Sequence, residues 1–363
     1  MIRSISAGRI DWTLIGLVVA LGGISVFNLQ STSTATGSEV YLRHLYFLLL
    51  GLGVMAAVAA INYRNLQRFA PVFYGVVVLL LAMVLVVGKE VNGSRRWLDL
   101  GVVGFQPSEL AKLAIILTLA SWFQRVPRPA GYTLRDLVPM GLLLGIPMFL
   151  VLQEPDLGHT LMLMFIGGSM LAYERFERRA LLTVVIFAVF FAPVMWKFVL
   201  RDYQKDRILT LLDGQADSLG AGWHARQARV AVGSGGLIGK GHRDGTQVAG
   251  GFLPENHTDF VFAHLAEEHG FAGAGLVLLL YLLLILSALR SAVRARDKFG
   301  GHVAVGVAAM FFWHVLMNIG MVLNLLPVTG VTLPLLSYGG TSALTVMAAI
   351  GLLLNIKLRR TAQ

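Results

Sequence analysis

Long apolar runs recur along the chain and are separated by short polar stretches. Most runs are about 16 to 25 residues long, which fits the length that an α-helix needs to cross a bilayer. The alternation of apolar and polar residues that a membrane β-barrel requires does not appear. We therefore predict an all-α membrane protein, a polytopic bundle of about ten transmembrane helices. The predicted spans are residues 12–27, 42–61, 69–88, 108–123, 136–152, 157–172, 180–199, 259–288, 302–326 and 338–356.

Composition agrees with this pattern. Of 363 residues, 56% are apolar and 14% are charged, and the mean hydropathy is +0.70. A soluble domain cannot cover so much apolar surface with so few polar side chains. The 40 glycines suit helices that pack closely in a membrane, and the absence of cysteine excludes disulfides and thiolate chemistry. We treat residues 1–363 as a single transmembrane domain.

The net charge of +10 follows a membrane topology rather than the pattern of a nucleic-acid-binding protein. In membrane proteins, Lys and Arg gather beside the spans on the cytoplasmic side. Here they gather near residues 3–9, 64–68, 125–135, 175–179, 290–298 and 357–360. The intervening turns near 28–41, 153–156 and 327–337 hold none. Both termini are therefore predicted to be cytoplasmic.

Two segments on the outer side carry positive charge against this rule, near 89–96 and over 200–258. A segment as long as 200–258 is usually functional or disordered, and its mixed composition predicts a folded extracytoplasmic loop or short helices over the bundle. Its glycine-rich run, 233–241, lacks the spacing of a phosphate-binding loop, because Gly241 stands where a hydroxyl residue is needed. Turn-forming glycines near the membrane surface are the better interpretation.

Few ionisable residues lie within or beside the spans, where they are costly and often functional. Glu109 and Lys112 share one helix face, which is consistent with a simple ion pair or with part of a site. Asp259 lies where the long segment re-enters the membrane, and helix capping is the stronger interpretation for it taken alone. Glu154-Pro155-Asp156 is interpreted as a tight turn.

The eighth predicted span adds further ionisable residues. Glu267 and Glu268 follow Asp259 on what is expected to be one helix. His264, His269 and the later His314 show no metal-binding spacing, because the pattern His-Glu-x-x-His is absent. A metal bound by carboxylates alone stays open as an alternative.

The polar stretch before the fourth span contains Arg95, Arg96 and Trp97. Paired arginines bind phosphate through charge-assisted hydrogen bonds. A Trp ring stacks on a sugar or lies at the headgroup level of a membrane. The alternative to substrate binding, given equal weight, is a Trp at the membrane interface beside solvated arginines.

Several motifs occur together along nearly the whole chain, and their combination resembles the SEDS family of shape, elongation, division and sporulation proteins. The segments are Arg96-Trp97-Leu98-Asp99, Phe105-Gln106-Pro107-Ser108-Glu109 with Lys112, Pro155-Asp156-Leu157-Gly158, Gly233-Ser234-Gly235-Gly236, Leu253-Pro254-Glu255 with His257-Thr258-Asp259-Phe260, and Pro334 with Ser337-Tyr338-Gly339-Gly340. The stretches Gly239-Lys240-Gly241 and Gly245-Thr246-Gln247 are similar to the rod-elongation branch rather than the division branch.

The resemblance implies a peptidoglycan glycosyltransferase that polymerises lipid II into β-1,4-linked glycan strands during elongation and rod-shape maintenance, with inversion and release of undecaprenyl diphosphate. It implies a bacterial plasma membrane location, a site that faces the periplasm or exterior, and a class B penicillin-binding protein as partner. No cofactor is assigned, with Mg²⁺ or Mn²⁺ left open, and no nucleic acid is expected. The alternatives are a lipid II flippase and a non-catalytic scaffold for the penicillin-binding protein.

The resemblance implies a role for Asp259, and the charges of other residues suggest theirs. Asp259 is expected to be the general base that takes the proton of the attacking sugar hydroxyl. Lys112 is expected to keep Asp259 ionised, with Glu109 orienting Lys112 through a salt bridge. Substrate binding is assigned to Arg96, Trp97, Glu109, Lys112 and Arg207.

Overall fold

The computed structural model describes residues 11–36, 39–91, 94–99, 104–212, 221–253 and 255–359. Within these residues the chain is almost entirely helical, so the all-α prediction is confirmed. Arg3, Arg9 and Arg360, which entered the charge pattern, lie outside the described residues, as do Pro254 and short parts of both outer segments.

One long helix corresponds to each of the ten predicted spans. The helices are α1 (Trp12–Thr36), α2 (Val40–Ala60), α3 (Tyr63–Val87), α4 (Pro107–Arg125), α5 (Leu134–Gln153), α6 (Leu157–Ala172), α7 (Arg178–Val194), α11 (Val261–Val293), α12 (Lys298–Val322) and α13 (Gly340–Arg359). In the described chain, seven helices are long and apolar enough to cross a membrane, namely α1, α2, α3, α5, α11, α12 and α13. The total of about ten crossings stays a prediction.

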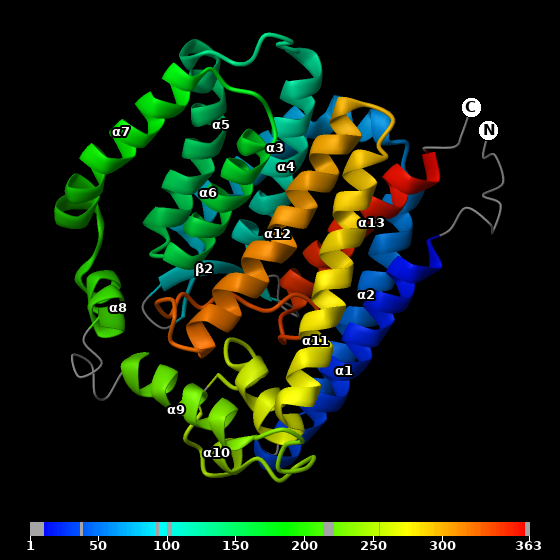
Figure 1. Ribbon diagram of the computed structural model, residues 1–363, viewed down its shortest axis with the longest axis vertical. Coiled ribbons are helices and arrows are strands. Elements are labelled where there is room, and N and C mark those ends of the chain that lie inside the picture. Colours follow the sequence, from blue (N-terminus) through cyan, green and yellow to red (C-terminus); the bar gives the residue numbers. More distant parts are fainter. Residues whose placement is uncertain are drawn as a thin grey trace.

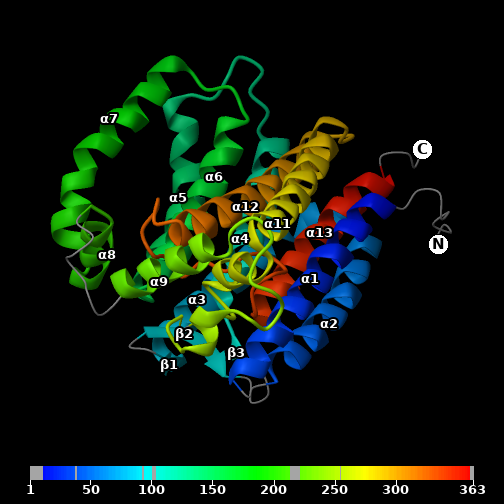
Figure 2. The ribbon, with the colours of Figure 1, turned by 60° about the horizontal axis from the view of Figure 1, so that its bottom comes forward.

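Short elements fill the two outer segments. The described part of 200–258 contains α8 (Asp202–Leu212), α9 (Ala221–Ser234) and α10 (Thr246–Ala249), as expected of short helices. A π-helical stretch, η2 (Met195–Val199), precedes them. A small antiparallel sheet, which the pattern of apolar residues did not predict, consists of β1 (Lys89–Val91), β2 (Ser94–Asp99) and β3 (Gly104–Phe105). Figures 1 and 2 show that the sheet and α8–α10 lie at the end of the bundle away from the termini.

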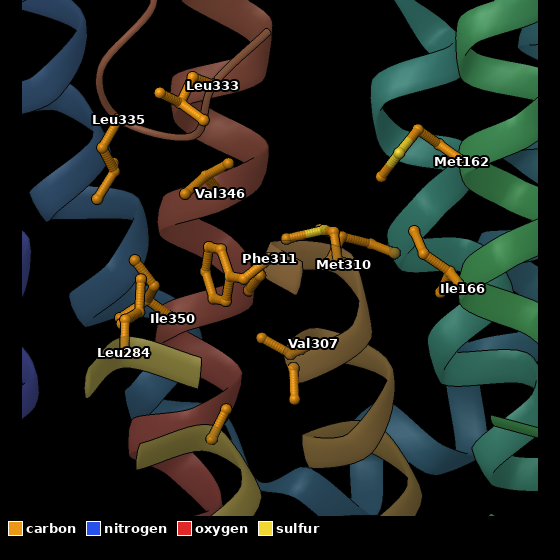
Figure 3. Packing of buried hydrophobic residues seen from close by; sticks show 14 of the residues in the cluster. Met162, Ile166, Leu284, Val307, Met310, Phe311, Leu333, Leu335, Val346 and Ile350 are labelled. Carbon is orange, nitrogen blue, oxygen red and sulfur yellow. The ribbon is translucent and has the colours of Figure 1, made fainter. Parts of the chain in front are cut away.

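The helices differ in how much lipid-facing surface they have. α12 runs through the middle of the bundle and packs against α11, α4 and α6, while α13 packs along α2 (Figure 1). Apolar side chains of α6, α11, α12 and α13 meet in the core, together with Leu333 and Leu335 of the loop after α12 (Figure 3). α7 lies at the edge of the bundle, and its exposed Phe187 and Phe190 suit contact with lipid.

Helix ends near the loop-rich end of the bundle are set by particular residues. Pro107 occupies the first turn of α4, where its missing N–H has no intrahelical partner to lose. Asp156 caps α6, since its side chain accepts a hydrogen bond from the backbone N–H of His159 at 3.0 Å. These caps place the first turns of α4 and α6, where most of the candidate site residues lie.

A break in α11 explains the glycine-rich run. Gly270 has a φ of 63°, which an L-residue with a side chain adopts only with strain. The backbone N–H of Phe271 donates to the carbonyl of Gly236 at 2.9 Å, so the run docks into the break. A Cβ on Gly239 would lie 2.0 Å from the carbonyl oxygen of Glu268. The glycines therefore serve a close backbone approach.

Candidate active site

A chain of buried charged groups links α4, α6 and α12. Lys112 Nζ lies 2.8 Å from Glu109 Oε2 and 3.0 Å from His314 Nε2. Glu109 Oε1 lies 2.9 Å from His159 Nε2, and His159 Nδ1 lies 3.0 Å from Asp156 Oδ2. The Lys112 and Glu109 side chains are at most 2% exposed. The expected ion pair between them is present, and it is one link of a longer chain.

Two members of this chain, His159 and His314, were missed as site residues. His314 is anchored on the loop after α12, because its Nδ1 lies 2.8 Å from the Thr332 carbonyl oxygen. It sits within an apolar helix, and an ionisable residue at such a position is itself a sign of function. His159 follows Asp156 by one helical turn, which allows both residues to act together.

Arg96 extends the chain of charges to the sheet. Its Nε and Nη2 donate to the carbonyl oxygens of Glu154 and Pro155 at 3.2 and 2.5 Å. Its Nη1 lies 3.7 Å from Asp156 Oδ2, and 30% of its side chain is exposed. Burial alone would raise the pKa of Asp156, but His159 and Arg96 outweigh burial and hold that pKa well below its usual range. The turn between α5 and α6 is thus also part of the site.

Glu154 is buried at the same turn. Neither oxygen of its carboxyl group has a hydrogen-bond partner among the described residues. Burial, reinforced by the nearby Asp156 carboxylate, raises the pKa of Glu154 to about 8. Its carboxyl group is therefore protonated at neutral pH.

We expect Glu154→Gln to gain stability relative to the wild type as the pH rises from 5 to 8. Because folding raises the pKa of Glu154, the folded state binds a proton that the unfolded state loses, and wild-type stability falls over this range. Gln cannot ionise and so removes this contribution. Apparent melting temperatures in detergent would test this against Glu177→Gln, a change at an exposed position. Parallel pH profiles for all three proteins would contradict it.

Asp259 lies immediately before α11. The N-cap of α11 is Phe260 and no side chain caps it, so the capping interpretation of Asp259 is wrong. The backbone carbonyl of Asp259 accepts a hydrogen bond from Asn318 Nδ2 at 2.8 Å, which ties this position to α12. Among the described residues we find no hydrogen-bond partner for the Asp259 carboxylate. That carboxylate is therefore available to a ligand.

The surroundings of Asp259 make its carboxylate a stronger base. Burial raises the pKa of Asp259 to about 6, and the Glu255 carboxylate contributes to the rise. The Arg207 guanidinium lowers this pKa. Of two smaller contributions, the Asp156 carboxylate raises it and His159 lowers it. At neutral pH most of the Asp259 carboxylate is ionised, yet it accepts a proton more readily than an exposed carboxylate does.

The expected role of Lys112 beside Asp259 needs correction. The Lys112 ammonium group is directed at Glu109 and His314. The positive group with the largest effect on Asp259 is Arg207. Arg207 of α8 therefore takes the part that was expected of Lys112, because the fold brings its guanidinium close enough to lower the pKa of Asp259.

The loop between α12 and α13 joins these parts. The Val328 carbonyl accepts a hydrogen bond from Arg207 Nη1 at 2.9 Å. A Cβ on Gly158 of α6 would lie 2.3 Å from the carbonyl oxygen of Thr329, so only glycine leaves room for the loop there. In the same loop, the Ser337 hydroxyl and the Tyr338 backbone N–H donate hydrogen bonds to the backbone carbonyls of the two residues before Asp259. The loop thus positions both Arg207 and the segment that carries Asp259.

Two candidates on β2 are less closely tied to the site. Arg95 is exposed and lies 3.6 Å from Glu90, so the structure does not bring it to the chain of charges. The Trp97 ring packs over Gly104 of β3, where a Cβ would lie 3.2 Å from the ring. The binding of a sugar or lipid by Trp97 stays a prediction.

A family model described as "Cell cycle protein", for FtsW, RodA and SpoVE, matches residues 8–362. The chain belongs to the FtsW/RodA/SpoVE family. The resemblance to SEDS proteins is thereby confirmed. Peptidoglycan glycosyltransferase MrdB of Escherichia coli K12 is 39% identical over 354 residues, which cover 97% of this chain and 94% of that protein. Peptidoglycan glycosyltransferase RodA of Treponema pallidum is 30% identical, with 96% and 98% covered.

Solved structures of this family share the fold. A chain in the structure described as "Structural coordination of polymerization and crosslinking by a peptidoglycan synthase complex" has a TM-score of 0.84 and 34% identity, covering 98% of this chain and 99% of that chain. The rod-shape-determining protein RodA of Thermus thermophilus has a TM-score of 0.73 and 31% identity, with 98% of both chains covered. As an FtsW/RodA/SpoVE member with several apolar helices, the chain is a multi-pass membrane protein.

Proposed function

We propose that this chain is a peptidoglycan glycosyltransferase that polymerises lipid II into β-1,4-linked glycan strands during cell elongation and rod-shape maintenance. Relatives that align over nearly the whole chain and are named peptidoglycan glycosyltransferases support the reaction class. The observation that carries the site assignment is the Asp259 carboxylate, which is ionised at neutral pH and has no described hydrogen-bond partner. Such a group can accept a proton from a substrate hydroxyl.

In the proposed reaction, the 4-hydroxyl of a lipid-linked GlcNAc attacks the anomeric carbon of a lipid-linked MurNAc. A new C–O bond forms with inversion while the bond from that carbon to the diphosphate oxygen breaks. Asp259 takes the proton of the attacking hydroxyl, and undecaprenyl diphosphate leaves with the bonding electrons. Diphosphate is a good leaving group, so no separate general acid is needed.

The leaving diphosphate develops negative charge that fixed positive groups can stabilise. Arg96 and Arg207 are partly exposed guanidinium groups, held by the Glu154 and Val328 carbonyls respectively, and we assign both to the diphosphate. Lys112 has three N–H donors, of which two face Glu109 and His314. Its remaining donor is the one we assign to a phosphate oxygen.

We propose Mg²⁺ or Mn²⁺ as a divalent cation for the same region. Hard cations bind through one or two carboxylates together with substrate phosphates, and Asp259 and the exposed Glu255 are carboxylates that act on each other. We propose that Glu255 would hold the ion together with the substrate diphosphate, which leaves Asp259 to act as the base. When bound, it would neutralise charge on the diphosphate.

We further propose a class B penicillin-binding protein as partner, a bacterial plasma membrane location, cytoplasmic termini and a site that faces the periplasm or exterior. The positively charged segments near the termini support this orientation. The candidate site lies at the end of the bundle away from the termini (Figure 1), which is consistent with it. The similar chain in a peptidoglycan synthase complex that coordinates polymerization and crosslinking supports a transpeptidase partner.

The purified chain, combined with its penicillin-binding protein and lipid II in detergent, should yield glycan polymer that is resolved by size. Parallel reactions with a chelator, and with Mg²⁺ or Mn²⁺ restored, would show whether a cation is needed. Vesicles loaded with lipid II would report translocation. Absence of polymer together with movement of lipid II across the vesicles would overturn the enzyme in favour of the flippase.

The pH dependence of polymerisation should report Asp259. With a pKa near 6, the base is lost on acidification, so kcat/KM should fall about tenfold per pH unit below pH 6 and level off above it. Arg207→Met should move this acidic limb to higher pH, because Arg207 lowers the pKa of Asp259. An acidic limb that stays in place in Arg207→Met would contradict the assignment of Arg207.

A further inference from the structure

Three possible metal ligands meet beside the break in α11, outside the chain of charges described above. They are His242 of the segment before α10, and Glu268 and His269 of α11, and one ligand atom of each lies within 4.8 Å of the other two. The Glu268 side chain is 1% exposed and that of His242 is 25% exposed. Sequence spacing did not reveal this cluster, because its residues come from two segments that meet only in the fold.

Each side chain of the cluster has a buried polar atom without a hydrogen-bond partner among the described residues. His242 Nδ1, His269 Nδ1 and Glu268 Oε2 are buried and have no hydrogen-bond partner among the described residues. Buried polar atoms are nearly always paired, and a bound ion is one physical reason for an apparent exception. Two of these atoms, His242 Nδ1 and Glu268 Oε2, lie 3.5 Å apart, and His269 belongs to the same cluster, which points to a shared ligand rather than to separate defects.

The carboxylate of Glu268 is held in place by its other oxygen. Oε1 accepts hydrogen bonds from the Ser31 hydroxyl and from the backbone N–H of Arg243, the latter at 3.0 Å. Oε2 remains directed at His242, 3.5 Å from Nδ1. Phe27 stacks on the His242 ring with a centroid separation of 4.0 Å and forms an apolar wall. Such supporting contacts orient ligands in known metal sites.

We infer that His242, Glu268 and His269 bind a transition-metal ion of the Zn²⁺ class. Two imidazoles and one carboxylate form a donor set that suits Zn²⁺ and leaves a fourth position for water. Mg²⁺ prefers an octahedral shell of oxygen ligands, so it does not suit this site. The three donors lie within 4.8 Å of one another, so side-chain rotations would have to bring them to a common ion.

The ion would fasten the glycine-rich segment to the broken helix. The backbone N–H of Gly241 already donates to the Glu268 carbonyl at 3.0 Å, and the metal adds a side-chain link across the same contact. Glu268 lies on the first stretch of α11, which begins at Val261, two residues after Asp259. The site therefore has a positioning role and is independent of whether Asp259 is the base.

The test uses the full chain with a tag that contains no histidine, purified in detergent, stripped with a chelator and reloaded with Zn²⁺. Bound zinc measured by mass spectrometry should reach one ion per chain, and the melting temperature should rise with Zn²⁺ but not with Mg²⁺. When Co²⁺ is loaded in place of Zn²⁺, the wild-type chain should show the visible absorption of a site with few ligands. This readout requires no amino-acid substitution. A wild-type protein that retains no Zn²⁺ and shows no such absorption would overturn the inference.

Substitutions locate the ion. His242→Ala and His269→Ala should each weaken Zn²⁺ binding at least about tenfold and abolish the Zn²⁺-dependent rise in melting temperature. His224→Ala on α9, outside the cluster, is the matched control and should behave as wild type. Equal zinc binding by all four proteins would place the ion elsewhere and sink the proposal. The metal-free melting temperature of each variant shows whether it is folded.

Discussion

Asp259→Asn should lower glycan polymerisation by about 10²- to 10⁴-fold, the usual contribution of a positioned general base. The amide has nearly the shape of the carboxylate but cannot accept the proton of the attacking hydroxyl. The backbone contact of Asp259 with Asn318 does not involve the side chain, so the variant should fold and bind its partner. Polymer yield from lipid II, normalised to purified protein, is the measurement.

Asp202→Asn is the matched control for this change. Asp202 lies on α8, and its side chain is 97% exposed in a surface pair with Lys205. The same substitution there should leave polymerisation unchanged. If Asp259→Asn keeps near-wild-type polymerisation, Asp259 is not the base. If it polymerises nothing but supports rod shape in cells, the scaffold alternative is favoured over the enzyme.

Lys112→Met should destabilise the chain by about 3–5 kcal/mol, because it leaves the buried Glu109 carboxylate without its cation. Glu109→Gln should be destabilising for the converse reason. The double variant Glu109→Gln with Lys112→Met removes both charges and should recover most of the lost stability, since neither partner is then left alone. Apparent melting temperatures in detergent measure each effect.

Activity of the double variant separates a structural role from substrate binding. If Lys112 binds the diphosphate, polymerisation should stay low after stability returns. Recovery of both together would make the pair structural only. The exposed pair Asp202 and Lys205 has the same spacing of three residues along a helix. Removing it should change neither quantity, since exposed pairs contribute little.

The helices of this protein could be anticipated because the membrane imposes a simple rule. Each spanning segment must be long, apolar and internally hydrogen-bonded, so the runs in the sequence correspond to α1–α7 and α11–α13. The sheet β1–β3 escaped detection, because its strands of two to six residues are too short for periodicity to show. The break at Gly270 was also not predicted, since a glycine within a helical pattern does not by itself indicate a kink.

The candidate site was anticipated only in part. Glu109 and Lys112 are three residues apart on one helix, so helical geometry alone predicts their contact. The links to His159 and His314 join α4 to α6 and α12, and no local rule predicts such contacts. That Arg207, and not Lys112, is the cation with the largest effect on Asp259 has the same cause, since tertiary packing ties Arg207 to the loop after α12.

By itself, then, the sequence determined the all-helical membrane class, the approximate spans and the residue types that resemble a family site, because these depend on composition and local spacing. The tertiary structure alone decided which charges meet. It joined His242 to Glu268 and His269, and it placed the loop after α12 against α6 and Arg207. Such contacts depend on how helices far apart in the chain cross one another, and that arrangement follows from side-chain packing throughout the bundle.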